Sequence, residues 1–304
     1  MNILPSNLRF GAGQSVRRLE DQRLVTGQGR FSDDRAQDGA LWLYVLRSPH
    51  AHARIVAIDA DAARAMPGVA AVYTGADLVA DEVGALPTLP LFKRLDGSPM
   101  AAPPRRLLAH EVVRFAGEPV AAVLASTRAA AQSAAEAIAV NYEERPAVIS
   151  PVDAMRPGAP VVWSDAPDNV AAGISYGDAA ATDAAFAAAA HVVTLDVASQ
   201  RLVPSAMEPR STMAEVDRKT GRLTLHVQSQ TPTATRDILA DAVLKRPKDS
   251  IHVLVGDIGG GFGHKVNLYP EDGLVAYAAA KLNRAVRWRG DRMDDFIGDR
   301  KSVV

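Results

Sequence analysis

The part of this chain best equipped for chemistry is a glycine-rich loop, GDIGGGFGHKV at residues 256–266. Adjacent glycines adopt positive φ angles easily and leave backbone N–H groups uncovered, so such a turn can bind an anion or let a bulky cofactor touch the main chain. The dinucleotide motif and the Walker A loop, begun at Gly259, both fail because they require glycine where His264 stands. The loop is therefore either a tightly packed turn or part of a binding site. Phe262, a large aromatic among the glycines, favours a core plug or a pocket wall.

A strand and a helix flank this loop. Residues 251–255 have the apolar run of a buried strand, and residues 270–282 begin with proline and two acids and end near a lysine, as helices do. Upstream, residues 222–228 alternate apolar and polar side chains and predict a hairpin with residues 213–216. Gln230 lies between that strand and a helix opened by Thr-Pro, so its side-chain amide is placed to point into a cleft.

The rest of the chain also alternates between strand and helix patterns. We expect one small α/β unit with right-handed crossovers in the first half. Proline-rich residues 80–106 predict an extended excursion, and further on residues 178–190 predict a small helix and residues 191–203 a long strand. The first half carries helix patterns at 59–66 and 128–139, and strand patterns at 40–46, 53–58, 69–73, 119–125 and 140–143.

Composition narrows the class of protein. The chain has 304 residues, 48% hydrophobic and 23% charged, with a net charge of −1. This suits a soluble globular protein of about two domains and produces no field that favours nucleic acid. The absence of cysteine excludes disulfides, thiolate nucleophiles and cysteine-bound zinc or iron–sulfur clusters. We find no secretory signal and no apolar run of roughly 18 residues for a membrane span, so we expect a cytoplasmic protein.

Several motifs together resemble one enzyme family. The glycine loop, Tyr269-Pro-Glu-Asp and residues 278–288 (AAAKLNRAVRW) are similar to the molybdopterin-binding large subunits of molybdenum hydroxylases, the group of xanthine dehydrogenase, aldehyde oxidase and carbon monoxide dehydrogenase. The resemblance extends along nearly the whole chain, and its motifs keep the family's order. They lie at residues 18–31, 47–55, 67–69, 74–78, 115–121, 207–210 and 230–232.

The resemblance implies a mixed α/β (α+β) fold in two parts. Residues 10–145 correspond to a small α/β hammerhead domain, and residues 146–170 to a proline-rich linker. Residues 171–304 correspond to the first part of a molybdopterin-binding α/β domain.

The resemblance also implies roles beside a molybdopterin-type molybdenum cofactor. The residues implied to contact that cofactor are Gly260, Gly261, Phe262, Gly263 and Gln230. Phe262 would form a wall of the substrate pocket, and Gln230 would hydrogen-bond next to the metal's ligands. No residue of the chain is expected to ligate a metal, since the family motif contains His50 and His52 without one.

The chemistry implied is hydroxylation of an aldehyde, an N-heterocycle or another small electrophilic carbon, with water as the oxygen source. Electrons would pass to iron–sulfur and FAD subunits, because this chain has no cysteine. The family's catalytic glutamate lies beyond residue 304, so Glu208, Glu215 and Glu271 are not given that role. We therefore expect the chain to be inactive alone and to join a second chain that carries the remaining molybdenum domains. Val266 stands where purine-oxidising members have glutamate, which argues against xanthine.

Several points stay open. Lys265 either meets the pterin phosphate or caps a carbonyl, and Glu208 is either near the substrate funnel or structural. Residues 291–295 are expected on a solvated face. The chain is either a split subunit or a fragment of a longer one. The alternatives are a truncated relative that acts as a cofactor-free interaction module, and an independent nucleotide-binding enzyme that uses the glycine loop.

Overall fold

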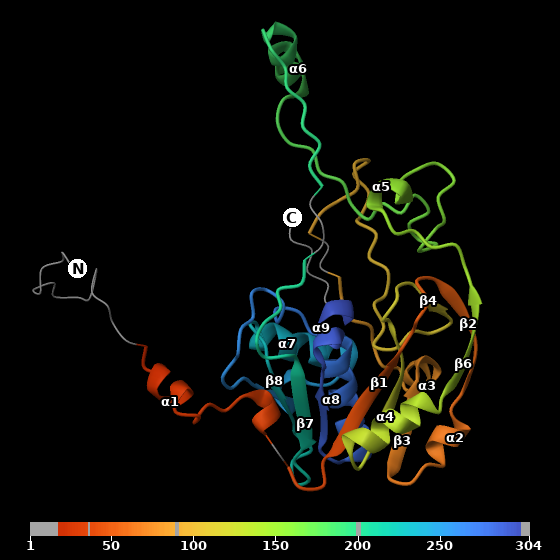
Figure 1. Ribbon diagram of the computed structural model, residues 1–304, viewed down its shortest axis with the longest axis vertical. Coiled ribbons are helices and arrows are strands. Elements are labelled where there is room, and N and C mark those ends of the chain that lie inside the picture. Colours follow the sequence, from red (N-terminus) through yellow and green to blue (C-terminus); the bar gives the residue numbers. More distant parts are fainter. Residues whose placement is uncertain (1–17, 36, 89–90, 199–201, 299–304) are drawn as a thin grey trace, which may run out of the picture.

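The computed structural model describes residues 18–298, apart from residues 36, 89–90 and 199–201. Its centre is a seven-stranded sheet in the order β3-β5-β1-β10-β7-β8-β9 (Figure 1). A smaller, three-stranded sheet has the order β4-β2-β6. The strands are β1 (Leu41–Arg47), β2 (Ala53–Asp59), β3 (Val69–Thr74), β4 (Val112–Val113), β5 (Pro119–Ala125), β6 (Ala139–Glu144), β7 (Ser211–Val216), β8 (Leu223–Val227), β9 (Ile251–Leu254) and β10 (Val286–Arg289).

Helices cover both faces of the large sheet. Ala122 and Leu124 of β5 belong to the same core cluster as the buried residues of helix α8, whereas Val123 packs with the alanines of helix α4. Because successive strand residues point to opposite faces, α8 and α4 lie on opposite sides of the sheet. The α-helices are α1 (Asp21–Val25), α2 (Asp61–Arg64), α3 (Gly75–Ala80), α4 (Arg128–Glu136), α5 (Pro151–Ala154), α6 (Ala179–Ala188), α7 (Pro232–Ile238), α8 (Pro270–Leu282) and α9 (Arg292–Gly298).

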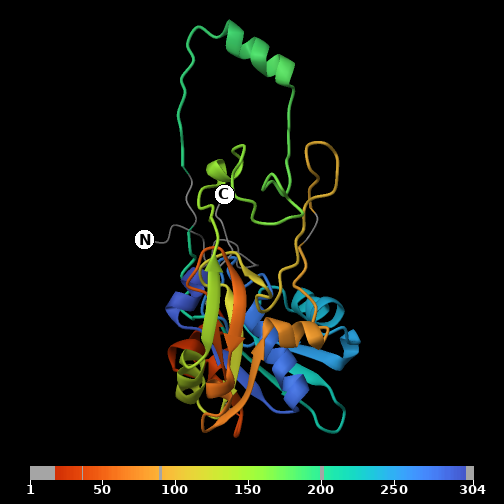
Figure 2. The same ribbon diagram turned by 90° about the vertical axis from the view of Figure 1, so that its right-hand side faces the viewer.

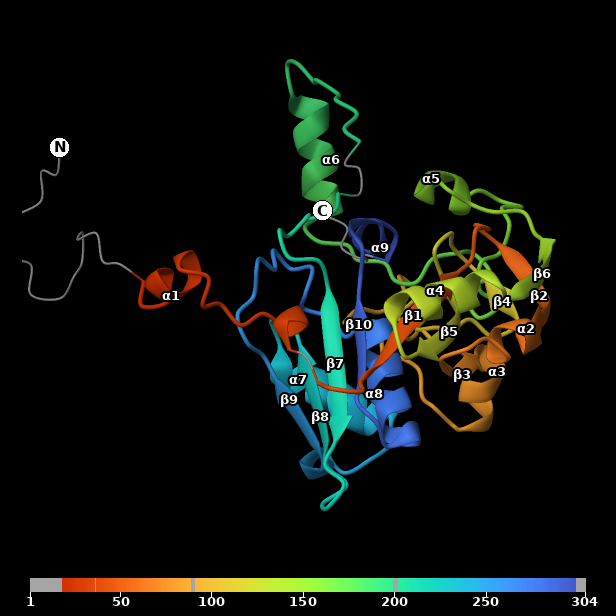
Figure 3. The same cartoon turned by 60° about the horizontal axis from the view of Figure 1, so that its bottom comes forward.

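Both halves of the chain, on either side of the linker expected from the sequence, contribute strands to the large sheet. Strand β1, from the first half, pairs in parallel with β10, from the second, and Leu41 lies opposite Val286 (Figure 3). Leu41 and Leu43 of β1 share one core cluster with Leu274 of α8. The two halves of the described chain therefore fold around a common core, and the domain limits drawn from the sequence stay a prediction.

The β-α-β crossover expected around residues 119–143 does not form within one sheet. Helix α4 follows β5 in the large sheet and leads into β6, which pairs with β2 in the small sheet. The pairs β1–β5, β3–β5 and β2–β6 are all antiparallel. The helix therefore connects two sheets, a topology that the local strand and helix patterns do not specify.

An arm that carries α6 stands away from the body of the molecule (Figures 1 and 2). The helix predicted at 178–190 is present, with the Asp178 side chain accepting a hydrogen bond from the N–H of Ala181 at its start. The strand predicted at 191–203 is wrong for its described part, because residues 191–198 and 202–203 belong to no strand. Val193 is 91% exposed there, so the apolar alternation is present without a neighbouring strand to pair with.

Within the described residues, none of the helices has both the length and the apolar character that a membrane span requires.

Candidate functional site

The glycine loop runs from the end of β9 to the start of α8 and turns sharply at its centre. Gly260, Phe262 and Gly263 have φ angles of +102°, +48° and +82°. A Cβ atom at Gly261 would lie 2.7 Å from the Cδ and Oε1 atoms of Gln230, so a side chain does not fit there without displacing that glutamine. Phe262 is 67% exposed and therefore does not plug the core.

Gln230 lies against the end of this loop. Its N–H donates to the carbonyl of Lys265 (2.8 Å), and its Oε1 accepts from the N–H groups of Gly263 (3.1 Å) and Lys265 (3.3 Å). No acceptor among the described residues faces its Nε2, and the residue is exposed. The structure thus brings together the glutamine and the glycine loop that the sequence singled out separately.

Two N–H groups of the loop also point away from internal partners. Within the described part of the chain, neither Gly260 nor Gly261 has a hydrogen-bond acceptor for its N–H. Both residues are partly exposed, so solvent or a ligand can approach this part of the loop. A cavity of about 590 Å³ borders the start of the loop at Gly259, between Met207 and Arg292.

Glu208 and Lys265 form a buried ion pair beneath the loop. The Nζ of Lys265 donates to the carboxylate Oε2 and to the backbone carbonyl of Glu208, at 3.0 Å in each case. Burial lowers the pKa of Lys265, and the neighbouring Glu208 opposes that shift. Of the two roles left open for Lys265, the structure shows the carbonyl cap. The sequence analysis did not predict the pairing with Glu208, although both residues stand in motifs that it quoted.

The first residues of the loop are tied to the start of the chain. Arg23 of α1 donates two hydrogen bonds to Asp257, each 2.6 Å long, and the N–H of Arg30 donates a third at 2.6 Å. The hydrogen bond from Arg23 is the largest cause that lowers the pKa of Asp257. Sequence reasoning missed this contact, because the two partners are far apart along the chain.

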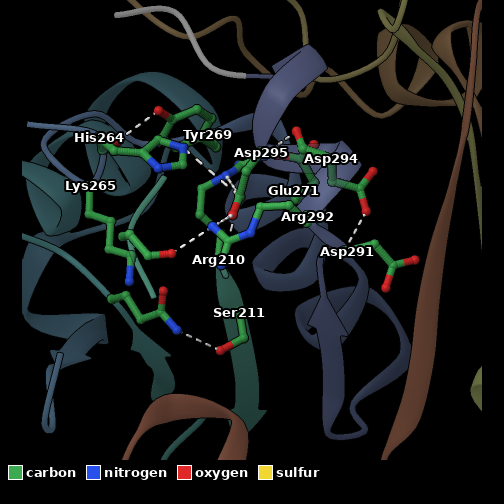
Figure 4. Close-up of polar contacts among 12 residues, drawn as sticks. Arg210, Ser211, His264, Lys265, Tyr269, Glu271, Asp291, Arg292, Asp294 and Asp295 are labelled. Atoms are coloured by element: carbon green, nitrogen blue, oxygen red, sulfur yellow. Dashed lines mark hydrogen bonds and ion pairs between the residues drawn. The ribbon is translucent and has the colours of Figure 1, made fainter. Parts of the chain in front are cut away.

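A buried charge network lies beside the loop, and Figure 4 shows Arg210, Glu271 and Asp295 of this network. Glu271 of α8 bridges two arginines in it. Arg210 donates to the Oε2 of Glu271 (3.0 Å), and Arg47 at the end of β1 donates to its Oε1 (2.6 Å). Arg210 also donates to Asp295 (3.2 Å), and Arg47 donates to Asp294 (2.9 Å). The network joins β1, the residue that precedes β7, and the helices α8 and α9.

This network corrects the expectation that residues 291–295 form a solvated face. Asp291 is exposed, as expected, but Asp295 is fully buried and Asp294 is partly buried. Both carboxylates turn inward because Arg210 and Arg47, from distant elements, supply opposite charges. A charged run in the sequence does not show which of its members has a partner.

The pKa values of two buried acids at this network are shifted from their ordinary values. Burial alone would raise the pKa of Glu271, but the attraction of Arg210 and Arg47 outweighs it and lowers the pKa to about 2. Burial dominates at the neighbouring Asp272 and raises its pKa to about 7. These two acids open α8, where the neighbouring arginines favour the ionised form of Glu271 and burial favours the protonated form of Asp272.

The two histidines considered as metal ligands have other contacts. The Nδ1 of His50 lies 3.3 Å from Glu144, and its ring contacts Tyr142. The Nδ1 of His52 is hydrogen-bonded to the carbonyl of Pro146 (2.8 Å). Across the residues that the structure describes, no group of three or more His, Asp or Glu side chains is arranged to hold a metal ion.

Comparison with known families assigns each half of the chain to a domain family. Residues 26–146 match the family described as the aldehyde oxidase and xanthine dehydrogenase a/b hammerhead domain. Residues 162–303 match the molybdopterin cofactor-binding domain. The fold thus combines a hammerhead part with a molybdopterin-binding part.

Individual relatives agree with these assignments. The chain is 36% identical to the carbon monoxide dehydrogenase large chain of Hydrogenophaga pseudoflava, over 91% of this chain and 34% of the relative. It is 36% identical to the nicotine 6-hydroxylase large subunit of Paenarthrobacter nicotinovorans, over 96% of this chain and 35% of the relative. Quinoline 2-oxidoreductase of Pseudomonas putida 86 superposes with a TM-score of 0.81 at 36% identity, over 94% of this chain and 36% of that one.

The chain belongs to the molybdenum hydroxylase large-subunit family. It spans about a third of the length of the relatives that it matches.

Proposed function

We propose that this chain forms one wall of the molybdenum pocket in a molybdopterin-dependent hydroxylase. The observation that carries the proposal is the combination of unpaired N–H donors at Gly260 and Gly261 with the side-chain amide of Gln230 beside them. Backbone donors in a glycine turn are suited to oxygen-bearing or anionic groups. The chain also matches the molybdopterin cofactor-binding domain over residues 162–303, which include all of these donors.

The residues present fit such a cofactor. The N–H groups of Gly260 and Gly261 have no acceptor within the described residues, and the lack of side chains at these positions lets the exposed Phe262 ring and the Gln230 amide lie directly against the loop. When bound, a molybdopterin-type cofactor supplies a two-electron acceptor and a Lewis acid for hydroxylation with water as the oxygen source.

The chain's own residues would bind and orient rather than react. The N–H groups of Gly260 and Gly261 would donate hydrogen bonds to the cofactor, and the Nε2 of Gln230 would donate beside them. The Oε1 of Gln230 is already held by Gly263 and Lys265, so the direction of its Nε2 is fixed. Phe262 would restrict the substrate side of the pocket. Glu208 and Glu271 are both engaged in ion pairs, which supports leaving the general base to another part of the enzyme.

The partners and substrate follow from the same proposal. We infer that the chain acts together with a further molybdenum-domain portion and with iron–sulfur and FAD subunits, and that it is inactive alone. The names of two relatives, a nicotine hydroxylase and a quinoline oxidoreductase, support an N-heterocycle as substrate. An aldehyde is the other substrate class that the family resemblance suggests.

Co-expression with the neighbouring genes tests this function. The purified complex should contain molybdenum and pterin, and Gln230→Ala and Phe262→Ala should still assemble but lose turnover. Gln132→Ala, on the exposed face of α4, is the matched control and should keep full activity. If complexes that contain this chain carry no molybdenum, the cofactor-free interaction module becomes the better description. Full activity of both site variants would show that the two residues are placed wrongly.

A further inference from the structure

The glycine loop needs an external support to hold its shape. Glycine is the residue with the greatest backbone freedom, so a run of glycines loses the most conformational entropy when it is ordered. The residues at the two ends of the segment 259–265, Gly259 and Lys265, are nevertheless both attached to one residue, Glu208. Glu208 lies 51 and 57 positions before them in the sequence.

The first attachment is a closed pair of hydrogen bonds. The N–H of Glu208 donates to the carbonyl of Gly259 (3.1 Å), and the N–H of Gly259 donates to the Oε2 of Glu208 (2.7 Å). A Cβ atom on Gly259 would lie 2.5 Å from the Cβ of Glu208, so this close approach requires glycine.

The second attachment is the ion pair with Lys265. The Nζ of Lys265 reaches the same Oε2 that accepts from Gly259, and it reaches the Glu208 carbonyl as well. The Lys265 side chain is 0% exposed and that of Glu208 is 13% exposed. Separating two buried opposite charges leaves each without compensation, so the pair resists opening far more than a surface pair does.

Lys265 also transmits this restraint to Gln230. Its backbone N–H and carbonyl both bond to Gln230, while its side chain bonds to Glu208. The position of Lys265 therefore fixes the glutamine amide and the end of the loop together.

We propose that Glu208 and Lys265 are positioning residues of the molybdenum pocket, whose buried ion pair clamps both ends of the glycine loop. The clamp sets the directions of the free N–H groups of Gly260 and Gly261 and of the Gln230 amide. This inference rests on the proposed function for its link to the cofactor, but the clamp itself is a property of this chain.

Hydrogen–deuterium exchange of the full chain tests the clamp without any cofactor. Lys265→Met and the double variant Glu208→Gln/Lys265→Met should raise exchange of the hydrogen-bonded N–H groups of Gly259, Gly263 and Lys265 at least tenfold. The double variant is informative because it leaves no unpaired buried charge, so the chain should keep its fold. Unchanged protection of β5 will show that it has done so. Lys248→Met, which removes an exposed lysine paired with Asp237 and Asp241, is the matched control and should exchange like the wild type.

The assembled complex tests the positioning role. For the double variant we expect kcat per bound molybdenum to fall at least tenfold while KM changes less than threefold, a split that simple instability would not produce. Wild-type exchange in the loop of a folded double variant would overturn the clamp whatever the molybdenum content. A wild-type complex that never acquires molybdenum would instead overturn the proposed function, and with it the role of the clamp in that pocket, even where loop exchange rises in the variant. Unaltered kcat in a loaded complex with a loosened loop would overturn the positioning role alone.

Discussion

Replacing Glu271 with glutamine should destabilise the fold strongly, because this carboxylate holds two buried arginines. Its oxygens accept from Arg47 at 2.6 Å and from Arg210 at 3.0 Å. Removing one partner of a buried ion pair costs about 3–5 kcal/mol. Arg47 keeps Asp294 and Arg210 keeps Asp295, so we expect the lower end of that range, about 3 kcal/mol. A pKa lowered from 4.5 to about 2 corresponds independently to roughly 3 kcal/mol.

The assay is urea unfolding of the full chain at several pH values. The pKa of Glu271 is depressed in the folded state, so its contribution is complete above pH 4.5 and disappears as the pH falls towards 2. The difference between wild type and Glu271→Gln should therefore shrink over that range. Asp61→Asn breaks an exposed pair with Arg64 and is the control, with an expected loss below about 1 kcal/mol. A loss below about 1 kcal/mol for Glu271→Gln, or a difference that persists unchanged to pH 2, would refute the reasoning.

Three other changes have defined outcomes. Folded Asp272, with its pKa raised to about 7, retains a proton that the unfolded chain releases near pH 4, so wild-type stability should fall as pH rises between these values. The urea midpoint of the Asp272→Asn variant should therefore not show this decrease as the pH rises. Gly261→Ala should lower the urea midpoint slightly, because its Cβ would displace the Gln230 amide from the N–H groups of Gly263 and Lys265, and it should lower the molybdenum content of the assembled complex. Gly84→Ala should cost about 3 kcal/mol in urea unfolding, since its Cβ would lie 1.7 Å from the backbone carbonyl of Ala242.

The elements whose signals are local could be predicted from the sequence. The helix at 270–282 was predicted with the bounds that the structure shows, because Pro270, two acids and Lys281 mark its ends. The strand at 119–125 also coincides with β5, since a short apolar run between turn residues suits a strand buried on both faces. The sequence singles out both Gln230 and the glycine loop, because each lies at a junction between a strand and a helix, but it does not predict their contact.

The features that depend on distant partners could not be predicted in the same way. Residues 191–203 have the alternation of a strand, yet a strand forms only where a neighbour satisfies its backbone groups, and the described part has none. Asp295 is buried between Arg292 of its own helix and Arg210, 85 residues earlier. The polarity of Asp295 favoured the surface, and the residues around it do not indicate the charge that Arg210 supplies from a distant part of the chain.

The two sides of the glycine loop differ in their polar groups: one side has unpaired N–H donors, and the other has a buried ion pair. A buried N–H without an acceptor is costly, so the free donors of Gly260 and Gly261 are tolerated only because they lie where water can reach them. Water at that position can later give way to a ligand oxygen at little net cost in hydrogen bonds. On the opposite side, the Lys265 side chain is closed to water, and there the support is an ion pair that opens with difficulty. A loop with a fixed inner side and solvated outer donors presents the same donor geometry before and after a ligand arrives, and a site that is ordered in advance loses less entropy on binding.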